Sequence, residues 1–391
     1  MKQGWEYKKL GEVCTIERGG SPRQITDYIT DSEDGINWIK IGDAQEGSKY
    51  ITSTKEKIRP EGIKKSRFVH KGDFILSNSM SFGRPYILKV DGCIHDGWLV
   101  IHDDNEVFIK DYLYYILSSP IMYAKFSQLA VGGVVNNLNS SLVRKVTIPL
   151  PPKSTQLTIV SELDKINELI RLKKEQLKDY DNLAQSIFYE MFGDPVENDK
   201  GWEVKKLGEI SIVKTGNTPP RSNERFYNEN FIEWIKTDNI RSDRMYPTTA
   251  AEYLSKEGAE CGRIVSKDSI LVACIAGSIS SIGKCCITTK EVAFNQQINA
   301  ITPNKDLCNS IYLYKLIVNS SRYIQQNATT GMKHILSKSI FEQIQIPLPP
   351  LPLQHLFAQR IEQIEYQKSA VRKSITDLET LLASRMQYWF E

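Results

Sequence analysis

One loop of this 391-residue sequence has a spacing similar to that of a nucleotide-binding loop. Gly277 and Gly283 precede Lys284, and glycine-rich loops that end in lysine bind phosphates through backbone amides and the lysine ammonium group. A phosphate-binding loop has one residue fewer between its glycines, and the Ser or Thr that holds magnesium follows its lysine. Cys285 stands at that position here. We therefore predict that this loop binds no nucleotide.

The other residues that could support catalysis also lack the required spacing. An adenine methyltransferase would need Asn-Pro-Pro followed by an aromatic residue, and the nearest match, at Asn217, has a threonine inserted before its prolines. A nuclease motif of Pro-Asp followed by Glu-x-Lys is absent from the sequence. The histidines show no metal-ligand spacing. They are His70, His95, His102, His334 and His355. We predict no catalytic residue and no metal site in this chain.

The composition sets limits on partners and compartment. Hydrophobic residues make up 41% and charged residues 25% of the chain, and the net charge of +3 gives no strong overall basic field that would indicate nucleic acid. The seven cysteines include no Cys-x-x-Cys spacing, which favours reduced thiols over a disulfide framework or a zinc site. The longest apolar run, Ile270 to Ala276, is too short to cross a bilayer, and the N-terminus has no apolar signal core. We expect a cytoplasmic protein.

Two long helices are the elements around which the chain is organised. Between Ile159 and Met191 apolar residues recur at steps of four and three, which predicts a helix of roughly 50 Å with coiled-coil patterning. The same pattern returns 198 residues later, from Phe357 to Trp389. Lys173 interrupts the first seam and Lys368 the second. The apolar seam residues are Ile159, Leu163, Ile166, Ile170, Leu177, Ile187, Phe357, Ile361, Ile364, Val371, Ile375, Leu378 and Leu382.

The two helices are predicted to pair with each other. The pentapeptide Ile-Pro-Leu-Pro-Pro precedes both, at 148–152 and at 346–350, so both seams begin at the same distance from a helix-stopping signal. With full antiparallel overlap Tyr180 would face Lys368. The alternative is that each helix packs separately on its own domain, as an ordinary amphipathic helix does.

The rest of the chain is a duplication. The opening Gly4-Trp5-Glu6 returns as Gly201-Trp202-Glu203, and Trp38-Ile39-Lys40 returns as Trp234-Ile235-Lys236. Each half begins with short β-branched or aromatic runs between turn residues; in the first half they are 13–16, 37–41, 74–76, 86–90 and 98–101. A helix is expected near 109–128, bent or restarted at Pro120, followed by a loop at Gly132 and Gly133.

This order of motifs resembles the specificity subunit of a type I restriction-modification system over the whole chain. The resemblance rests on the Gly-Trp-x-x-x-x-Leu-Gly-Glu opening of each half, on Trp-Ile-Lys, on Phe294-Asn295-Gln296-Gln297, and on Gln156 and Gln354 after the proline pairs. It implies an α+β fold: two mixed α/β target-recognition domains separated by two long helices that form an antiparallel coiled coil, with an internal pseudo-two-fold repeat. The expected segments are domain 1 at 1–152, helix 1 at 153–195, domain 2 at 196–350 and helix 2 at 351–391.

The resemblance also implies that each domain recognises one part of a two-part DNA site. Recognition segments about one helical turn apart (~34 Å) would place each domain in a major groove. The loops of the two halves differ, so we expect an asymmetric site. Arg and Lys suit guanine edges, Asn suits adenine, and small hydroxyl residues allow close approach. The candidate DNA-binding residues are Arg18, Ser21, Arg23, Lys40, Asn78, Arg84, Lys214, Arg221, Lys236, Ser278, Lys284 and Lys333.

Each of these residues could instead contact only phosphate, or no DNA at all. His95-Asp96 and the matching Asn295-Gln296 are expected to be structural rather than DNA-contacting.

The resemblance implies that the chain is a noncatalytic adaptor. Its expected partners are double-stranded DNA, two modification (methyltransferase) subunits docked on the long helices, and restriction subunits that translocate and cut DNA. The chain itself would hold no cofactor, since S-adenosylmethionine, ATP and Mg²⁺ would be used by the partner subunits. Charged residues on the outer helix faces, such as Glu162, Glu168, Arg171 and Lys174, could serve docking or could simply be solvated.

Two other functions remain open from the sequence. A fused modification enzyme would need the methyltransferase motif that is missing here. A coiled-coil scaffold that binds only protein would show no salt-dependent affinity for DNA.

Overall fold

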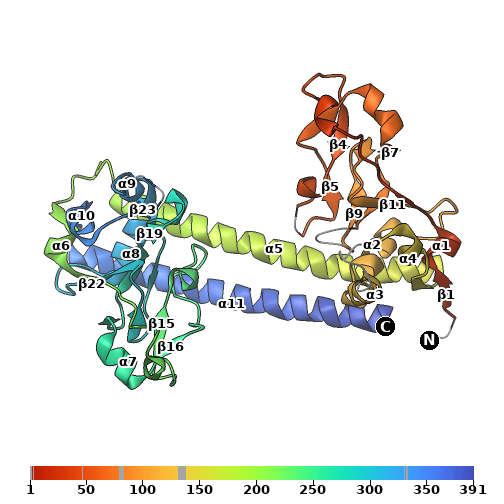
Figure 1. The fold of residues 1–391 in the computed structure, drawn as a ribbon. Helices are drawn as coiled ribbons and strands as arrows, with labels where there is room; N and C mark the ends of the chain where they lie inside the picture. Colours follow the sequence, from red (N-terminus) through yellow and green to blue (C-terminus); the bar gives the residue numbers. More distant parts are fainter. Residues whose placement is uncertain are drawn as a thin grey trace. The chain divides into compact units, whose positions relative to one another are not determined.

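The chain divides into two compact units in the computed structural model (Figure 1). The first unit contains Met1–Lys173 and Ser374–Glu391, and the second contains Lys174–Lys373. The structure describes residues 2, 4–45, 47–78, 83–130, 138–329, 331 and 333–391. The predicted loop at Gly132 and Gly133 therefore lies outside the described residues. Every helix in the described ranges is too short or too polar to span a lipid bilayer.

The globular part of the first unit is built on two sheets, each of which contains both parallel and antiparallel strand pairs. One has the order β2-β11-β8-β9-β5, and its strands are β2 (Thr15–Arg18), β11 (Trp98–His102), β8 (Phe74–Ser77), β9 (Pro85–Leu88) and β5 (Tyr50–Ile51). The other has the order β3-β6-β4-β10-β7, and its strands are β3 (Ile29–Thr30), β6 (Glu56–Ile58), β4 (Ile36–Ile39), β10 (Gly92–Ile94) and β7 (Arg67–Val69). A separate ladder pairs β1 (Glu6–Lys9) with β12 (Thr147–Leu150).

The second unit repeats this plan. One sheet has the order β14-β22-β18-β20, with strands β14 (Ser211–Thr215), β22 (Ile298–Pro303), β18 (Ile270–Ala273) and β20 (Cys285–Ile287). The other has the order β16-β15-β21-β17, with strands β16 (Tyr253–Leu254), β15 (Ile232–Ile235), β21 (Val292–Phe294) and β17 (Ile264–Val265). Separate ladders pair β13 (Val204–Lys206) with β24 (Gln345–Pro347) and β19 (Ile275–Ala276) with β23 (His334–Ile335). The predicted duplication therefore extends to the pairing of strands.

Short helices complete each unit. In the first they are α1 (Leu10–Val13), α2 (Lys110–Ser118), α3 (Pro120–Ala130) and α4 (Ser140–Arg144); in the second they are α6 (Leu207–Ile210), α7 (Lys256–Cys261), α8 (Ser310–Asn319), α9 (Ser321–Gln326) and α10 (Lys338–Glu342). The predicted restart at Pro120 is confirmed. The strand expected from Val13 begins only at Thr15, because Glu12 accepts a hydrogen bond from the Lys9 backbone N–H (3.0 Å) and stabilises a helical turn through Val13.

The two long helices are confirmed. Helix α5 (Lys153–Phe192) and helix α11 (Leu351–Phe390) each contain 40 residues. Within the second unit they run antiparallel: Phe192 near the end of α5 packs against Phe357 near the start of α11 (ring centroids 5.1 Å apart), and the earlier Asp181 bonds to the later Lys368. Lys368 thus contacts the neighbour of Tyr180, one residue from the predicted register.

Near the C-terminal end of each long helix, the buried residues are no longer those of the predicted seam. Ile159, Leu163, Ile361 and Ile364 of the predicted seam are buried. At the end of α5, however, the fully buried residues are Phe188 and Phe192, whereas Ile187 is only partly buried. The end of α11 repeats this with Met386 and Phe390. These residues join the core of the globular part of their unit, so the last turns pack on a domain as well as on the other helix.

A buried glutamine attaches each long helix to its globular part. Gln156 is 1% exposed; its Oε1 accepts from the Ile109 N–H (2.7 Å), and its Nε2 donates to the carbonyls of Val107 (3.1 Å) and Pro151 (3.0 Å). Ile109 immediately precedes α2. This network fixes the start of α5 against the start of α2.

Gln354 forms the same network in the second unit. Its Oε1 accepts from the Asn309 N–H (2.8 Å), and its Nε2 donates to the carbonyls of Leu307 (3.2 Å) and Pro349 (2.7 Å). Asn309 immediately precedes α8, so the attachment is duplicated together with the domain.

Candidate nucleic-acid interface

Three of the candidate residues in the first unit meet at Asp96. This residue lies in the turn between β10 and β11. Arg18, at the end of β2, donates from Nε to the Asp96 carbonyl (3.0 Å), and its guanidinium lies 3.8 Å from the Asp96 carboxylate. Ser21 donates to the same carboxylate (2.8 Å), and the Asn78 amide donates to the Asp96 carbonyl (2.8 Å). Strand ends far apart in sequence therefore meet at this turn.

The prediction that Asn78 contacts a base needs a correction. It is 1% exposed, and its side chain holds the turn rather than pointing to solvent, so we remove it from the candidate base-contacting residues. The loop that follows it, residues 79–82, lies outside the described residues.

His95 is the internal support of this turn. The Gly97 N–H donates to its Nδ1 (2.6 Å), and the Ile41 N–H lies 3.3 Å from its Nε2. A neutral imidazole has a single acceptor nitrogen, and the shorter contact assigns that role to Nδ1. Burial lowers the pKa of His95, although Asp96 and Asp43 oppose this shift, so the neutral imidazole is favoured. Because Ile41 follows Lys40, the Lys40 loop is attached to the same turn.

The backbone beside the Asp96 turn comes so close to position 19 that only glycine fits there. A Cβ on Gly19 would lie 2.2 Å from the His95 carbonyl oxygen, and one on Gly216 would lie 2.1 Å from the Asn295 carbonyl oxygen. Both positions therefore require glycine, and the two units share this tight packing.

The matching turn of the second unit uses different side chains. Asn295 Oδ1 accepts from the Gln297 N–H (3.1 Å), as His95 does from Gly97, and Thr218 donates to Gln296, as Ser21 does to Asp96. Thr218 was not among the candidate residues, although it matches Ser21 in the repeat. The pairs His95-Asp96 and Asn295-Gln296 both support their turns, as expected.

An acidic residue faces the Trp-Ile-Lys lysine in both units. Lys40 forms an ion pair with Glu56, and Lys236 forms one with Glu252. In the second unit Arg221 also binds Glu252, and its guanidinium lies over the rings of Tyr227 (4.6 Å) and Trp234 (4.8 Å). Neither glutamate was among the predicted residues, because base edges and phosphates are recognised mainly by cations and amides. Their shared position, 16 residues after the lysine, was the available signal.

The remaining candidate residues lie at exposed positions. Ser278 and Lys333 flank the β19–β23 ladder at the same end, because Ala276 pairs with His334. Lys214 lies on β14, and Lys284 directly precedes β20. In the first unit Arg23 and Arg84 are exposed. The structure thus brings Arg18, Ser21 and Lys40 together around one turn and Arg221 and Lys236 on one carboxylate, but it does not unite all twelve residues.

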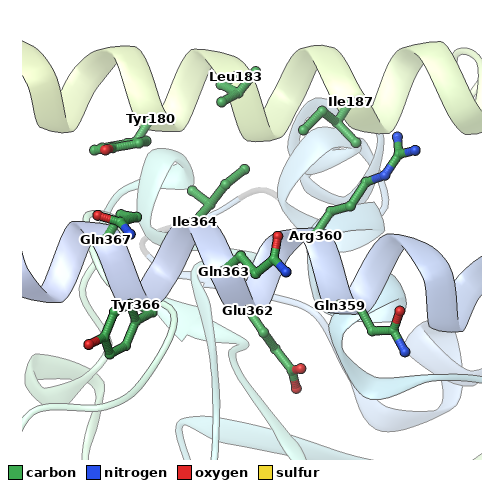
Figure 2. A pocket seen from close by; sticks show the side chains of 10 residues that line it. All are labelled: Tyr180, Leu183, Ile187, Gln359, Arg360, Glu362, Gln363, Ile364, Tyr366 and Gln367. Atoms are coloured by element: carbon green, nitrogen blue, oxygen red, sulfur yellow. The ribbon is translucent and has the colours of Figure 1, made fainter.

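A groove of about 770 Å³ follows the helix pair in the second unit (Figure 2). Tyr180 and Ile187 of α5 face Ile364 and Arg360 of α11 across it. Tyr366, on its rim, is 74% exposed. The groove therefore presents apolar and aromatic surface to solvent, a composition typical of protein contact sites.

The matching positions of the first unit are closed by an ion pair. Arg385, the repeat counterpart of Ile187, bonds to Glu162, the counterpart of Arg360, and Trp389 donates from Nε1 to the same carboxylate (2.9 Å). The hydrogen bond from Arg385 lowers the pKa of Glu162. Glu162 is thus engaged within the helix pair, and the two ends of that pair present different surfaces.

The comparisons with known proteins agree over most of the chain. The family model described as "Type I restriction modification DNA specificity domain" matches residues 2–179 and 199–380. The HindI specificity subunit of Haemophilus influenzae, a type I restriction enzyme subunit, is 28% identical, and the alignment covers 98% of each chain. The MjaIX specificity subunit of Methanocaldococcus jannaschii is 27% identical over 58% of this chain and 56% of the relative.

Solved structures show the same fold. A chain from a study of complex assembly and conformational transition in a type I restriction-modification system has a TM-score of 0.64 and 19% identity, covering 99% of this chain and 97% of the other. The type I S subunit from M. genitalium has a TM-score of 0.53 and 13% identity, covering 100% and 98%. The predicted fold class is confirmed.

Proposed function

This chain belongs to the family of type I restriction-modification DNA specificity domains, and from that premise we propose that each of its units recognises one part of an asymmetric, two-part DNA site. The curated relatives are specificity subunits, which are noncatalytic components of such systems. The prediction that this chain is not itself an enzyme is therefore confirmed.

One observation carries the asymmetry: the same turn has different side chains in the two units. Asp96 and Gln296 occupy matching positions, and so do Arg18 and Thr215. Arg18 bonds to the Asp96 turn, whereas Thr215 donates to Asn299 (2.8 Å). Because hydrogen-bonding groups decide which bases a surface accepts, two such surfaces recognise different sequences.

The exposed cations contribute to the affinity for DNA. We assign phosphate or base contacts to Arg23, Arg84, Lys214, Lys284 and Lys333, which are all exposed. Each phosphate neutralised by such a residue releases counterions, so the affinity falls as the salt concentration rises. Arg18, Ser21, Lys40, Arg221, Lys236 and Ser278 complete the proposed set.

The second part of the proposal concerns docking on the long helices. The groove beside Tyr180 and Ile364, with the exposed Tyr366 and Leu183 (47% exposed), supports a contact with a modification subunit. In this assembly, placed in the cytoplasm, modification subunits would use S-adenosylmethionine to methylate adenine. Restriction subunits would use ATP and Mg²⁺ to translocate and cut DNA.

Methylome sequencing of the native strain, with and without this gene, tests the DNA specificity. We expect one split motif with N6-methyladenine to lose its methylation when the gene is deleted. If methylation is unchanged, binding of the purified complex to DNA decides the matter: an assembled complex with no sequence preference would contradict the proposal.

A substitution in the groove tests the docking. Leu183→Asp places a charge on an exposed apolar site and should prevent co-sedimentation with the modification subunit. Glu190→Gln on the same helix is the matched control, since its side chain is also exposed and lies outside the groove. Unchanged assembly of the Leu183→Asp variant would exclude this groove as the docking site.

A further inference from the structure

Two DNA-binding candidates of the second unit share one carboxylate. Lys236 and Arg221 both form ion pairs with Glu252, one on each oxygen. The side chain of Arg221 is 53% exposed, and those of Lys236 and Glu252 are 27% and 35% exposed. The hydrogen bond from Lys236 is the main cause of the lowered pKa of Glu252. The Glu252 carboxylate is therefore ionised at neutral pH, and all three side chains remain accessible from solvent.

The backbone fixes the carboxylate in this place. Glu252 directly precedes β16, which pairs antiparallel with β15, and its carbonyl accepts from the Trp234 N–H (3.1 Å). Trp234 in turn forms the surface on which Arg221 lies, and Lys236 Nζ lies 5.1 Å from the same ring. Both cations thus have a defined position, set by an aromatic surface below and a carboxylate beside them.

The stability of the fold gives little reason for this arrangement. Ion pairs at such exposure contribute little to folding, because solvent screens them and two long side chains lose freedom. Two cations and one anion leave a net charge of +1, although the site carries two positive groups. The carboxylate therefore removes half of the positive charge that DNA would otherwise meet.

We propose that Glu252 is a positioning residue that withholds Arg221 and Lys236 from arbitrary DNA. This inference rests on the proposed function. Before the two cations can bind DNA fully, an acceptor on a base edge, such as the O6 and N7 of guanine, must replace the carboxylate at the positions where the cations are held. DNA that presents no such acceptor there interacts with only part of the positive charge of the two cations. Glu252 thus lowers nonspecific affinity.

The first unit offers an internal comparison. Lys40 pairs with Glu56, but Arg23, the repeat counterpart of Arg221, is exposed and forms no ion pair among the described residues. Removal of the Glu56 charge therefore frees one cation, whereas removal of the Glu252 charge frees two that already lie together. The effect on DNA binding should be larger in the second unit.

The test measures the affinity of the full chain for a random-sequence DNA duplex between about 50 and 200 mM salt. We expect Glu252→Gln to bind roughly 3- to 10-fold more tightly at the lower salt concentration. The slope of log affinity against log salt should steepen by about one, the contribution of one further phosphate contact. Glutamine keeps the size of the side chain and a carbonyl acceptor.

Two further variants make the result specific. Glu233→Gln is the matched control, because Glu233 lies on β15 beside Trp234 and pairs with Lys290 (3.0 Å), outside this group. It should change neither the affinity nor the slope. The double variant Lys236→Gln/Glu252→Gln has the original net charge at the site and should restore the wild-type slope.

The outcomes separate the inference from the proposed function. If the wild-type chain shows salt-dependent binding and Glu252→Gln behaves like Glu233→Gln, the inference is overturned and the proposed function stands. If the wild-type chain, folded and assembled, shows no affinity for DNA at any salt concentration, the proposed function fails and the inference fails with it.

Discussion

Lys368 donates from Nζ to the carboxylates of Asp181 (2.6 Å) and Glu365 (2.7 Å), although its side chain is only 3% exposed. It occupies a seam position of α11, where the heptad pattern would place an apolar residue. Arg372 also approaches Glu365, at 3.8 Å. A buried charge persists here because oppositely charged partners surround it.

Replacement of Lys368 by methionine should therefore destabilise the second unit. The change leaves Glu365, itself 8% exposed, without its nearest cation, and removal of one partner from a buried pair costs about 3–5 kcal/mol. Urea unfolding measures the loss. The double variant Lys368→Met/Glu365→Gln should recover part of it. Equal stability of the single variant and the wild type would show that the cluster is not buried in solution.

Replacement of Gln354 by alanine should destabilise the second unit nearly as much as replacement of Lys368 by methionine. Its side chain makes three hydrogen bonds to backbone groups and is fully buried. At about 1 kcal/mol each, Gln354→Ala should lower the free energy of unfolding by roughly 3 kcal/mol. Gln363→Ala, at an exposed position of the same helix, is the control and should change it little. Similar midpoints of urea unfolding for the two variants would contradict this account.

His95 should make the first unit sensitive to acid. Burial lowers its pKa below the unfolded value of about 6.5, so the stability that depends on neutral His95 is complete above that value. It is lost as the pH falls toward the folded pKa, since the unfolded chain then binds more protons. Lys40, Asp43 and Asp96 are the charged groups that influence it.

The matched variant is His95→Asn, which copies the residue at the same position of the second unit and keeps an acceptor for the Gly97 N–H. It should weaken the fall in melting temperature between pH 7 and pH 5. An unchanged pH dependence would mean that other groups cause it.

Exchange of residues 1–152 should change only one part of the recognised DNA site. The first globular part has its own sheets and its own turn at Asp96. The second part would keep its turn at Gln296, with Thr218, unchanged. Methylome sequencing of a strain carrying a chimera with a relative's 1–152 segment would reveal the new motif. A change in both parts would show that the two units do not act separately.

The sequence predicted the repeated plan because its causes are local. Heptad spacing, paired prolines and alternating strands report on neighbouring residues along the chain. The burial of Phe188 and Phe192 could not be predicted in this way, since it depends on where Tyr312 and Phe357 lie after folding. The heptad rule describes contact with one partner helix, whereas these last turns contact a domain as well.

The candidate site was predictable only in part for a similar reason. The cations Lys40, Lys236 and Arg221 could be identified by type and by repeat position. Their neutralisation by Glu56 and Glu252 depends on strand pairing, which the sequence does not specify by residue type. The burial of Asn78 follows from a turn assembled from three separate strand ends.

The buried glutamines at the helix starts make their side-chain hydrogen bonds to main-chain atoms. Gln156 bonds to the backbone of Val107, Ile109 and Pro151, and Gln354 to that of the matching residues. These hydrogen bonds therefore depend on the path of the main chain and not on which side chains the globular part carries. A globular segment of different sequence that keeps this main-chain path would preserve these hydrogen bonds at either helix start.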